Sequence, residues 1–122
     1  MSDESPRRFR LANHLRLRNA GDFERIYALR QRAGDNHLLI FAAQNDLPFA
    51  RFGLSVSRKH GNAVRRHRLK RLMREAFRLS QHELPAGFDF ILIPRQGTAA
   101  GVNDFARSLR RLSAKLARRI GC

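Results

Sequence analysis

The spacing of hydrophobic residues along the chain changes between helical and strand periods. Phe23, Ile26 and Tyr27 recur at helical spacing. Asp22, just before them, is a residue type that favours a helix N-cap. The sequence Gly-Asp-Asn at residues 34–36 favours a turn over a helix. The pattern therefore predicts a first short helix that begins near Asp22 and ends before this turn.

Three further segments have the composition and length of β-strands. Residues 38–43 are a continuous apolar run, and residues 49–57 alternate between apolar and polar side chains. Residues 88–94 are a second apolar run, which a proline ends. We expect a mixed sheet of about four strands, in which the additional strand is split off near residues 38–49.

Two longer helices are indicated by apolar residues that recur every three or four positions. Within residues 58–80 the apolar face consists of Leu69, Leu72, Met73, Ala76 and Phe77. Near the C-terminus, Asn103 can cap a helix whose apolar positions are Phe105, Leu109, Leu112, Leu116 and Ile120. We expect both helices to pack these apolar faces on the sheet.

The order of the elements predicts the fold class. A strand, a helix and a strand follow one another over residues 51–94, which favours a parallel β-α-β crossover within the mixed sheet. With three helices, this is an α/β (α+β) two-layer sandwich. Residues 1–12 carry Ser, Pro and five charges without periodicity. We predict a flexible basic arm over residues 1–12 and a single domain over residues 13–122.

The charge of the chain points to a polyanionic partner. Lys and Arg number 25 against 10 Asp and Glu, which gives a net charge of +15 in 122 residues. A folded domain this basic repels itself unless an anion neutralises it, and 43% hydrophobic residues exclude a disordered basic tail.

No apolar stretch is long enough to span a membrane, and the N-terminus lacks the apolar core of a secretory signal. The single cysteine, Cys122, cannot form an internal disulfide, and we expect a cytoplasmic protein without a membrane partner.

The positive charge is concentrated in residues 58–78, which carry nine Lys and Arg and one acid, Glu75. On a helix, a stripe opposite the apolar face is formed by His67, Arg71, Arg74 and Arg78. Neighbouring arginines repel one another, and a solvated helix face normally includes acids that relieve the repulsion. A planar guanidinium group binds phosphate oxygens through two hydrogen bonds. The stripe therefore favours phosphate binding over a merely solvated face.

Groups that could catalyse a reaction are sparse in the sequence. The ten acids are scattered, the five histidines are dispersed, and the cysteine has no neighbouring metal ligand. No glycine-rich loop of the nucleotide-binding classes is present. Phe23, Tyr27 and Phe41 could stack unpaired bases, but their spacing alone favours core positions. The residues predict a nucleic-acid binder without catalytic or metal-binding side chains.

Two adjacent segments resemble a known family. Residues 52–64 (FGLSVSRKHGNAV) and 66–77 (RHRLKRLMREAF) closely resemble the signature of the bacterial ribonuclease P protein component, and the similarity extends over about residues 16–118. The resemblance implies a subunit of a ribonucleoprotein that removes the 5′ leader from precursor tRNA. In such a complex the RNA subunit and its Mg²⁺ ions hydrolyse the phosphodiester bond, while the protein binds that RNA and the leader. The family fold also implies a left-handed β-α-β crossover, whereas nearly all such units are right-handed.

The same resemblance assigns residues to two binding surfaces. The family's Arg-Asn-Arg motif falls on residues 66–68, where His67 replaces the asparagine. An imidazole can still bond one phosphate or base, but it lacks the paired donor and acceptor of an amide. The implied contacts with the RNA subunit are Arg65, Arg66, His67, Arg68, Lys70, Arg71, Arg74 and Arg78. In a cleft between the first helix and the sheet, the implied leader contacts are Phe23, Tyr27, Phe41, Arg58 and Lys59.

Three hypotheses for the function follow. The first is the ribonuclease P protein subunit, with the catalytic RNA and precursor tRNA as partners, no obligatory protein partner, and Mg²⁺ bound mainly by the RNA. The second is a ribosomal-type protein that stabilises a large RNA without taking part in a reaction. The third is a nuclease that acts without RNA, which the scattered acids disfavour. Composition does not separate the first two hypotheses, and only the signature favours the first.

Overall fold

The computed structural model describes residues 11–121, so residues 1–10 of the predicted arm and Cys122 lie outside the described part of the chain. Leu11 and Ala12 pack against the hydrophobic core. The helices are η1 (Asn13–Leu15), α2 (Ala20–Ala28), η2 (Arg58–His60), α3 (Ala63–Ser80) and α4 (Val102–Gly121), of which η1 and η2 are short 3-10 helices. The strands are β1 (Arg32–Gly34), β2 (Leu38–Gln44), β3 (Arg51–Leu54) and β4 (Phe88–Pro94).

The four strands form one mixed sheet in the order β1-β2-β4-β3. β2 pairs antiparallel with both β1 and β4, whereas β3 and β4 are parallel. The chain between β3 and β4 contains α3, which confirms the predicted parallel crossover. The handedness of the crossover stays a prediction from the resemblance. The predicted α+β sandwich of a four-stranded mixed sheet and three α-helices is confirmed.

The additional strand does not lie where the sequence pattern placed it. We expected it near residues 38–49, but β1 precedes that run and forms a hairpin with β2. Asp35 closes the hairpin turn, because its Oδ1 accepts hydrogen bonds from His37 N at 2.9 Å and Leu38 N at 3.0 Å. The turn-forming residues 34–36 therefore connect two strands and do not end a helix. A three-residue strand is too short to show an alternating pattern.

The first α-helix also begins earlier than expected. Asn19, and not Asp22, is the N-cap of α2: its Oδ1 accepts a hydrogen bond from Gly21 N at 2.7 Å. Asp22 lies in the first turn instead, where a carboxylate interacts favourably with the helix dipole. Both residue types suit either position, so the sequence pattern could not choose between them.

The other two helix starts are set by local side-chain hydrogen bonds. α3 begins after the separate turn η2, because Asn62 Oδ1 accepts a hydrogen bond from Arg65 N at 2.9 Å. α4 begins one residue before Asn103, so that residue is not its cap. Asp104 instead accepts a hydrogen bond from Gly101 N at 3.0 Å.

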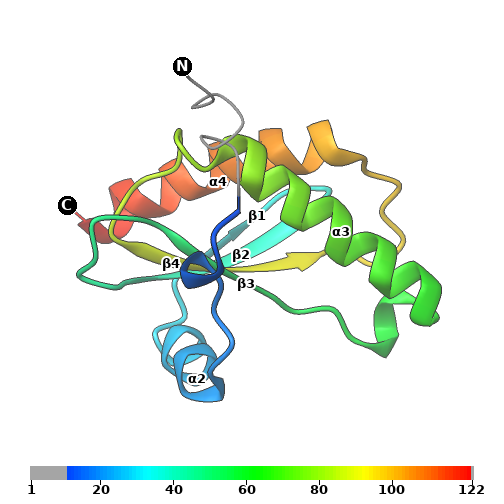
Figure 1. Ribbon diagram of the computed structural model, residues 1–122, viewed down its shortest axis with the longest axis horizontal. Helices are drawn as coiled ribbons and strands as arrows, with labels where there is room; N and C mark the ends of the chain where they lie inside the picture. Colours follow the sequence, from blue (N-terminus) through cyan, green and yellow to red (C-terminus); the bar gives the residue numbers. More distant parts are fainter. Residues whose placement is uncertain (1–10, 122) are drawn as a thin grey trace.

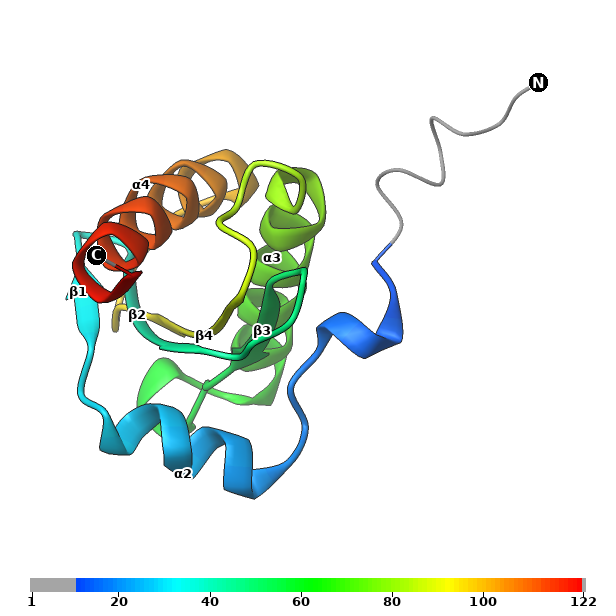
Figure 2. The ribbon, with the colours of Figure 1, turned by 90° about the vertical axis from the view of Figure 1, so that its left-hand side faces the viewer.

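The helices cover the two faces of the sheet unequally. α3 and α4 lie side by side on one face, and α2 lies alone on the other (Figures 1 and 2). On the two-helix face, Phe52 of β3 stacks on Phe77 of α3 with ring centroids 4.2 Å apart. Ile40 of β2 packs on this side, whereas Phe41 and Ala43 pack toward α2. The predicted apolar face of α3 is confirmed, since Leu72 is partly buried and the buried residues include Leu69, Met73, Ala76 and Phe77.

A buried carboxylate connects β4 to the elements around it. Asp89 of β4 is completely buried, and Arg51 of β3 donates two hydrogen bonds to it at 2.8 Å and 2.7 Å. Arg25 of α2 donates at 2.5 Å and Asn45 donates at 2.8 Å. Burial raises the pKa of Asp89, but the hydrogen bonds from Arg51, Asn45 and Arg25 outweigh this effect and hold the pKa below its usual value. Asp89 thus joins α2, β3 and the turn after β2 to the central strand.

We expect Asp89→Ala to lower the free energy of unfolding by about 1.5–3 kcal/mol, because the partly buried guanidinium groups of Arg51 and Arg25 lose their hydrogen bonds to a charged group. Urea-induced unfolding followed by circular dichroism measures this loss. Glu83→Ala is the control, since Glu83 lies 3.9 Å from Arg110 and both side chains are largely solvated. Its expected cost is below about 0.5 kcal/mol. Equal losses in the two variants would contradict the role of Asp89.

The lowered pKa of Asp89 also makes stability depend on pH. Its stabilising contribution is complete above the pKa of an unfolded aspartate, about 3.9, and is lost as pH falls through the lower pKa of the folded state. The pKa values of Asp35 and Glu75 are lowered as well, so these acids also make stability depend on pH. The contribution of Asp89 is therefore isolated by comparing wild type with a variant that lacks only the Asp89 carboxylate. We expect the stability gap between wild type and Asp89→Asn to shrink as pH falls from about 6 to about 3. A gap that does not change with pH would refute this assignment.

Candidate nucleic-acid interface

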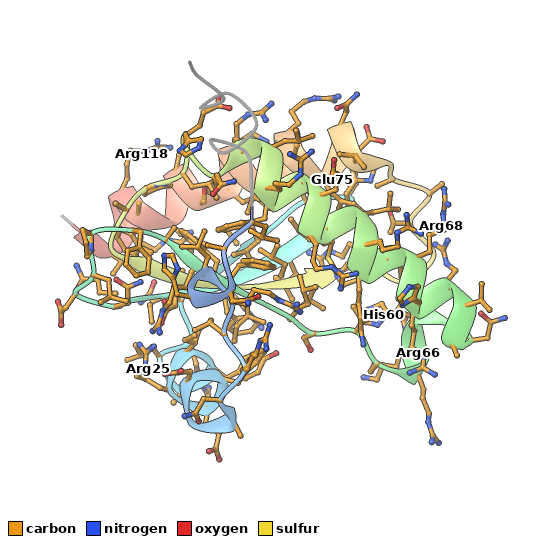
Figure 3. The ribbon with its side chains drawn as sticks, viewed as in Figure 1. Arg25, His60, Arg66, Arg68, Glu75 and Arg118 are labelled. Atoms are coloured by element: carbon orange, nitrogen blue, oxygen red, sulfur yellow. The ribbon has the colours of Figure 1, made fainter. Side chains whose placement is uncertain are left out.

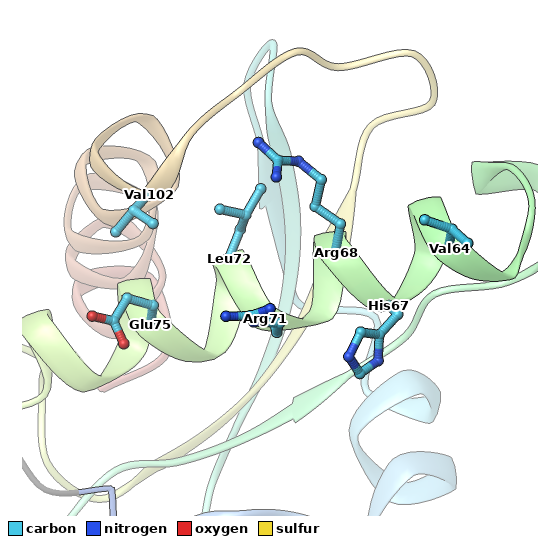
Figure 4. A pocket seen from close by; sticks show the side chains of 7 residues that line it. All are labelled: Val64, His67, Arg68, Arg71, Leu72, Glu75 and Val102. Carbon is cyan, nitrogen blue, oxygen red and sulfur yellow. The ribbon is translucent and has the colours of Figure 1, made fainter.

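The solvent face of α3 carries cations beside a surface cavity. His67, Arg68 and Arg71 line a cavity of about 570 Å³, to which Val102 at the start of α4 contributes (Figure 4). We define the α3 stripe as four cations that form no ion pair within residues 11–121: Arg68, Lys70, Arg71 and Arg74. Their positive charge is therefore not neutralised by the protein.

Two arginines at the start of α3 bind protein carbonyl groups. The guanidinium group of Arg65 donates to the carbonyl oxygen of Thr98, in the loop before α4. Arg66 Nε donates to the Gly61 carbonyl oxygen at 3.2 Å. Gly61 has a φ of 119°, which residues with a side chain rarely adopt. Arg65 thus joins the start of α3 to the loop before α4, and Arg66, which Figure 3 labels, stabilises the turn that leads into the helix.

At the other end of the helix, Arg78 is paired with the acid of this segment. Arg78 donates two hydrogen bonds to the Glu75 carboxylate, at 3.0 Å and 2.6 Å. The hydrogen bond from Arg78 lowers the pKa of Glu75, and the same contact raises the pKa of Arg78. The sequence pattern placed Arg78 in a continuous stripe of unpaired cations. The structure shows that the uncompensated charge ends at Arg74.

The cationic surface extends beyond α3 to a residue that sequence reasoning missed. Arg16 forms an isolated parallel bridge with Phe52, and its guanidinium lies 5.9 Å from the centroid of that ring. Burial, and then the charges of Arg18 and Arg74, lower the pKa of Arg16. Three arginines therefore gather here from segments far apart in sequence. The Leu-Arg alternation at residues 15–18 was the signal that could have indicated an extended, half-buried segment.

On the opposite face of the sheet, α2 presents aromatic rings to the strands. Phe23 lies directly over Gly53, where an added Cβ would be 2.5 Å from the ring. Tyr27 meets Phe41 of β2 edge to face, with ring centroids 4.9 Å apart and an interplanar angle of 78°. All three rings are partly buried and pack against a small core under α2. The resemblance is thus right to bring these aromatic residues together between the first helix and the sheet.

Two cavities open on this face beside α2. One, of about 440 Å³, is lined by Leu39, Ile93 and Lys59 among others. The second, of about 350 Å³, is lined by Tyr27, Arg30, Arg32 and Phe41. Leu39 of the first cavity and Phe41 of the second lie two positions apart on the same face of β2. We call the two cavities, together with the Phe23 ring beside Tyr27, the outer groove, and its principal residues are Phe23, Tyr27, Leu39, Phe41, Lys59 and Ile93.

The basic residues around the outer groove differ from those inferred from the sequence. Lys59 lines the larger cavity as expected, whereas Arg58 is exposed in η2 and is not among its lining residues. Arg95 lines the same cavity from the end of β4, and Arg30 and Arg32 line the smaller one. Sequence reasoning missed these three arginines because they form no periodic stripe on a predicted element.

The loop that carries Lys59 is held against the sheet by His60. Ser57 N donates to His60 Nδ1 at 3.0 Å, and His60 Nε2 lies 2.8 Å from the Pro94 carbonyl oxygen. An imidazole that accepts at Nδ1 and donates at Nε2 is the neutral tautomer with its proton on Nε2. His60 therefore fixes the wall of the outer groove, and it faces protein groups at both nitrogens.

Comparison with known proteins agrees with this arrangement of surfaces. A family model described as Ribonuclease P matches residues 11–117. The chain belongs to the ribonuclease P protein family. It is 42% identical over 106 residues to the ribonuclease P protein component of Edwardsiella ictaluri, covering 86% of each chain. It is 41% identical over 88 residues to that of Oleidesulfovibrio alaskensis, covering 70% of each.

Solved structures of the family share the fold. The ribonuclease P protein of Thermotoga maritima matches with a TM-score of 0.71 at 30% identity, covering 80% of this chain and 96% of that one. That of Staphylococcus aureus matches with a TM-score of 0.71 at 30% identity, covering 85% and 95%.

The protein is therefore a subunit of ribonuclease P, a ribonucleoprotein endoribonuclease that processes the 5′ end of tRNA, and it associates with the RNA subunit. This confirms the central part of the first hypothesis, that the chain is the ribonuclease P protein subunit and that the RNA subunit is its partner. In residues 11–121 no helix is long and apolar enough to cross a membrane.

We expect Gly53→Ala to displace the Phe23 ring and lower the free energy of unfolding by about 1–3 kcal/mol, because the added methyl group overlaps the ring. In a Phe23→Ala background the same substitution has space, so its cost is expected to vanish. Urea unfolding of the four proteins in this double-mutant cycle measures the coupling. Additive losses would contradict the close approach of ring and strand.

Proposed function

We propose that this ribonuclease P protein contacts RNA through two separate surfaces. The α3 stripe binds the RNA subunit, and the outer groove binds the 5′ leader of precursor tRNA. The observation that carries the proposal is the division of chemistry between the faces of the sheet: uncompensated cations on one, half-buried aromatic rings on the other. The two surfaces lie on opposite sides of β3 and β4, so one protein can touch both RNAs at once.

The α3 stripe is suited to phosphate groups of a folded RNA. Like charges on adjacent helix turns repel one another, and Glu75, the acid on the same helix, is already hydrogen-bonded to Arg78. Phosphate oxygens remove this repulsion and accept paired hydrogen bonds from each guanidinium. Arg16 and Arg18 widen the cationic surface beyond the helix. Such contacts are independent of sequence and position a protein on its RNA.

The outer groove is suited to a single strand. Half-buried aromatic rings offer stacking surfaces that only unpaired bases can use. Lys59 and Arg95 provide positive charge at the larger cavity for the backbone of such a strand. A 5′ leader is the single-stranded part of precursor tRNA next to the cleaved bond, so the groove fits the leader better than it fits a duplex.

His67 contributes to the first surface in a different way from the family asparagine. Its imidazole is exposed and lines the cavity on α3 together with Arg68 and Arg71 (Figure 4). An imidazole nitrogen can donate or accept one hydrogen bond with a phosphate or a base edge, whereas an amide can do both. We propose that His67 makes a single hydrogen bond to the RNA subunit at this position.

Mg²⁺, the metal that the family implies, belongs to the RNA in this proposal. Within the described chain, no group of three His, Cys, Asp or Glu side chains is close enough to hold a metal ion. The carboxylates of Asp35, Glu75 and Asp89 each pair with arginine. This donor set does not fit a Mg²⁺ site, and we derive no hydrolytic step from protein side chains. RNA-bound Mg²⁺ would activate water and stabilise the developing charge.

We further propose that the protein needs no obligatory protein partner and acts in the cytoplasm as one domain of residues 13–122. The large hydrophobic residues exposed within residues 11–121 lie at separate places on the surface: Leu29 after α2, Val64 at the start of α3 and Leu79 near its end. Such isolated residues do not form the contiguous apolar patch that a protein interface requires.

We expect the double variant Arg68→Ala, Arg71→Ala to bind the RNA subunit more weakly and with a flatter salt dependence. Each phosphate that is no longer bound reduces the slope of log K against log salt by about 0.7–0.9. Filter binding over a range of salt concentrations measures the slope. Arg78→Ala is the matched control, because Glu75 already neutralises Arg78, and its slope is expected to change less. An unchanged slope in the double variant would refute the proposed role of the α3 stripe.

A further inference from the structure

The end of the outer groove at β1 is built from three arginines that the proposed function does not use. Arg30 follows α2, Arg32 lies in β1, and both line the smaller cavity together with Tyr27 and Phe41. Arg119 reaches this place from the last turn of α4, where its Nη1 donates to the Arg32 carbonyl oxygen at 2.8 Å. Two segments that are distant in sequence, residues 30–32 and the last turn of α4, thus bring three arginines to one edge of the sheet.

The geometry combines charge with an aromatic surface. Arg32 pairs with Phe41 across the β1–β2 ladder, and its guanidinium lies 6.0 Å from the centroid of the Phe41 ring. The three arginines are exposed, and within residues 11–121 none of them forms an ion pair. The site therefore offers uncompensated positive charge directly beside rings on which a base can stack.

The backbone of Arg30 gives an independent reason to look for a ligand here. Its φ is 55°, in the left-handed region where glycine is the favoured residue after a helix. An arginine at such a position strains the backbone without adding a buried contact, since its side chain is exposed. An arginine side chain thus occupies a position where the stability of the backbone alone would favour glycine.

The position of this site in the fold gives the leader a direction. α2 runs across the sheet from the side of β3 to the side of β1, and α3 lies at the β3 side (Figure 2). The leader of a precursor tRNA that is held by the RNA subunit enters the groove from the side of α3. If it follows α2, it meets Phe23 first and Tyr27 next. Arg30, Arg32 and Arg119 come last, at the β1 edge. With strands about 4.8 Å apart, the path across four strands is about 14 Å long, which is a few nucleotides.

We propose that Arg30, Arg32 and Arg119 form a phosphate-binding rim for the upstream part of the leader, beyond the nucleotides that stack on Tyr27 and Phe41. The inference rests on the proposed binding of the leader in the outer groove. It adds that the groove ends in an electrostatic contact with the leader backbone. Because the rim contacts phosphates, it strengthens binding of long leaders irrespective of their sequence and increases the salt dependence of that binding.

The test compares leader lengths in the reconstituted holoenzyme. Precursor tRNAs with a two-nucleotide and a ten-nucleotide leader are bound by the wild-type complex and by the variant Arg32→Gln, Arg119→Gln, with cleavage suppressed. We expect the variant to bind the long-leader substrate several-fold more weakly and the short-leader substrate within about twofold of wild type. For the long leader, the salt slope is expected to fall by about 0.7 for each phosphate of a single strand that the variant no longer binds.

Arg107→Gln is the matched control. Arg107 is an exposed arginine of α4 that takes part in neither proposed surface, so its removal is expected to affect both leader lengths equally. If the wild type prefers the long leader and the rim variant keeps that preference, the rim is refuted while leader binding in the groove stands. If the wild type shows no dependence on leader length, binding of the leader in the outer groove is itself refuted.

Arg30→Gly separates binding from folding. Glycine relieves the left-handed backbone, so the thermal midpoint of the free protein is expected to stay the same or rise. The same variant is expected to lose part of the preference for long leaders. A variant that unfolds at a lower temperature, or that keeps the full preference, would contradict the assignment of Arg30 to the rim.

Discussion

Parallel neighbours in a sheet cannot be joined by a tight turn, so the chain between β3 and β4 must cross the sheet, and α3 is that crossing. The crossing helix has to place its apolar residues on the sheet, as the stacking of Phe77 on Phe52 shows. Its arginines are then left on the outer side. α4 fills the rest of this face, and the short α2 alone covers the other. The positions of the two surfaces that we propose to bind RNA thus follow from one topological constraint.

Two acids of the described residues, Asp89 and Asp35, are placed where they stabilise the fold. Asp89 is paired with Arg25 and Arg51, and Asp35 is paired with Arg111. These pairs connect elements that are distant in sequence, and none of them lies on the α3 stripe. A chain with a net charge of +15 can therefore fold without neutralising its binding surfaces. The repulsion that remains between exposed arginines is the part that RNA relieves.

Much of the fold could be predicted from patterns within single segments. The apolar runs at residues 38–43 and 88–94 became β2 and β4, and the amphipathic segments became α3 and α4. The strand β1 and the helix caps were predicted wrongly, because they depend on pairing and hydrogen bonds that several neighbouring residues could make equally well. In the site, Arg71 and Arg74 of the α3 stripe were visible as part of a periodic pattern. Arg16, Arg30 and Arg32 were not, since they lie outside the predicted helix and their place depends on how the chain folds back on the sheet.

The sequence by itself determined that the protein is a basic RNA binder of the ribonuclease P family, because charge density and the long signature are properties of contiguous residues. Only the tertiary structure decided which cations are available. It turns Arg65 toward Thr98 and brings Arg119 to the edge of β1. The physical reason is that a hydrogen bond needs two groups within about 3 Å, and spacing along the chain does not determine that distance between separate elements.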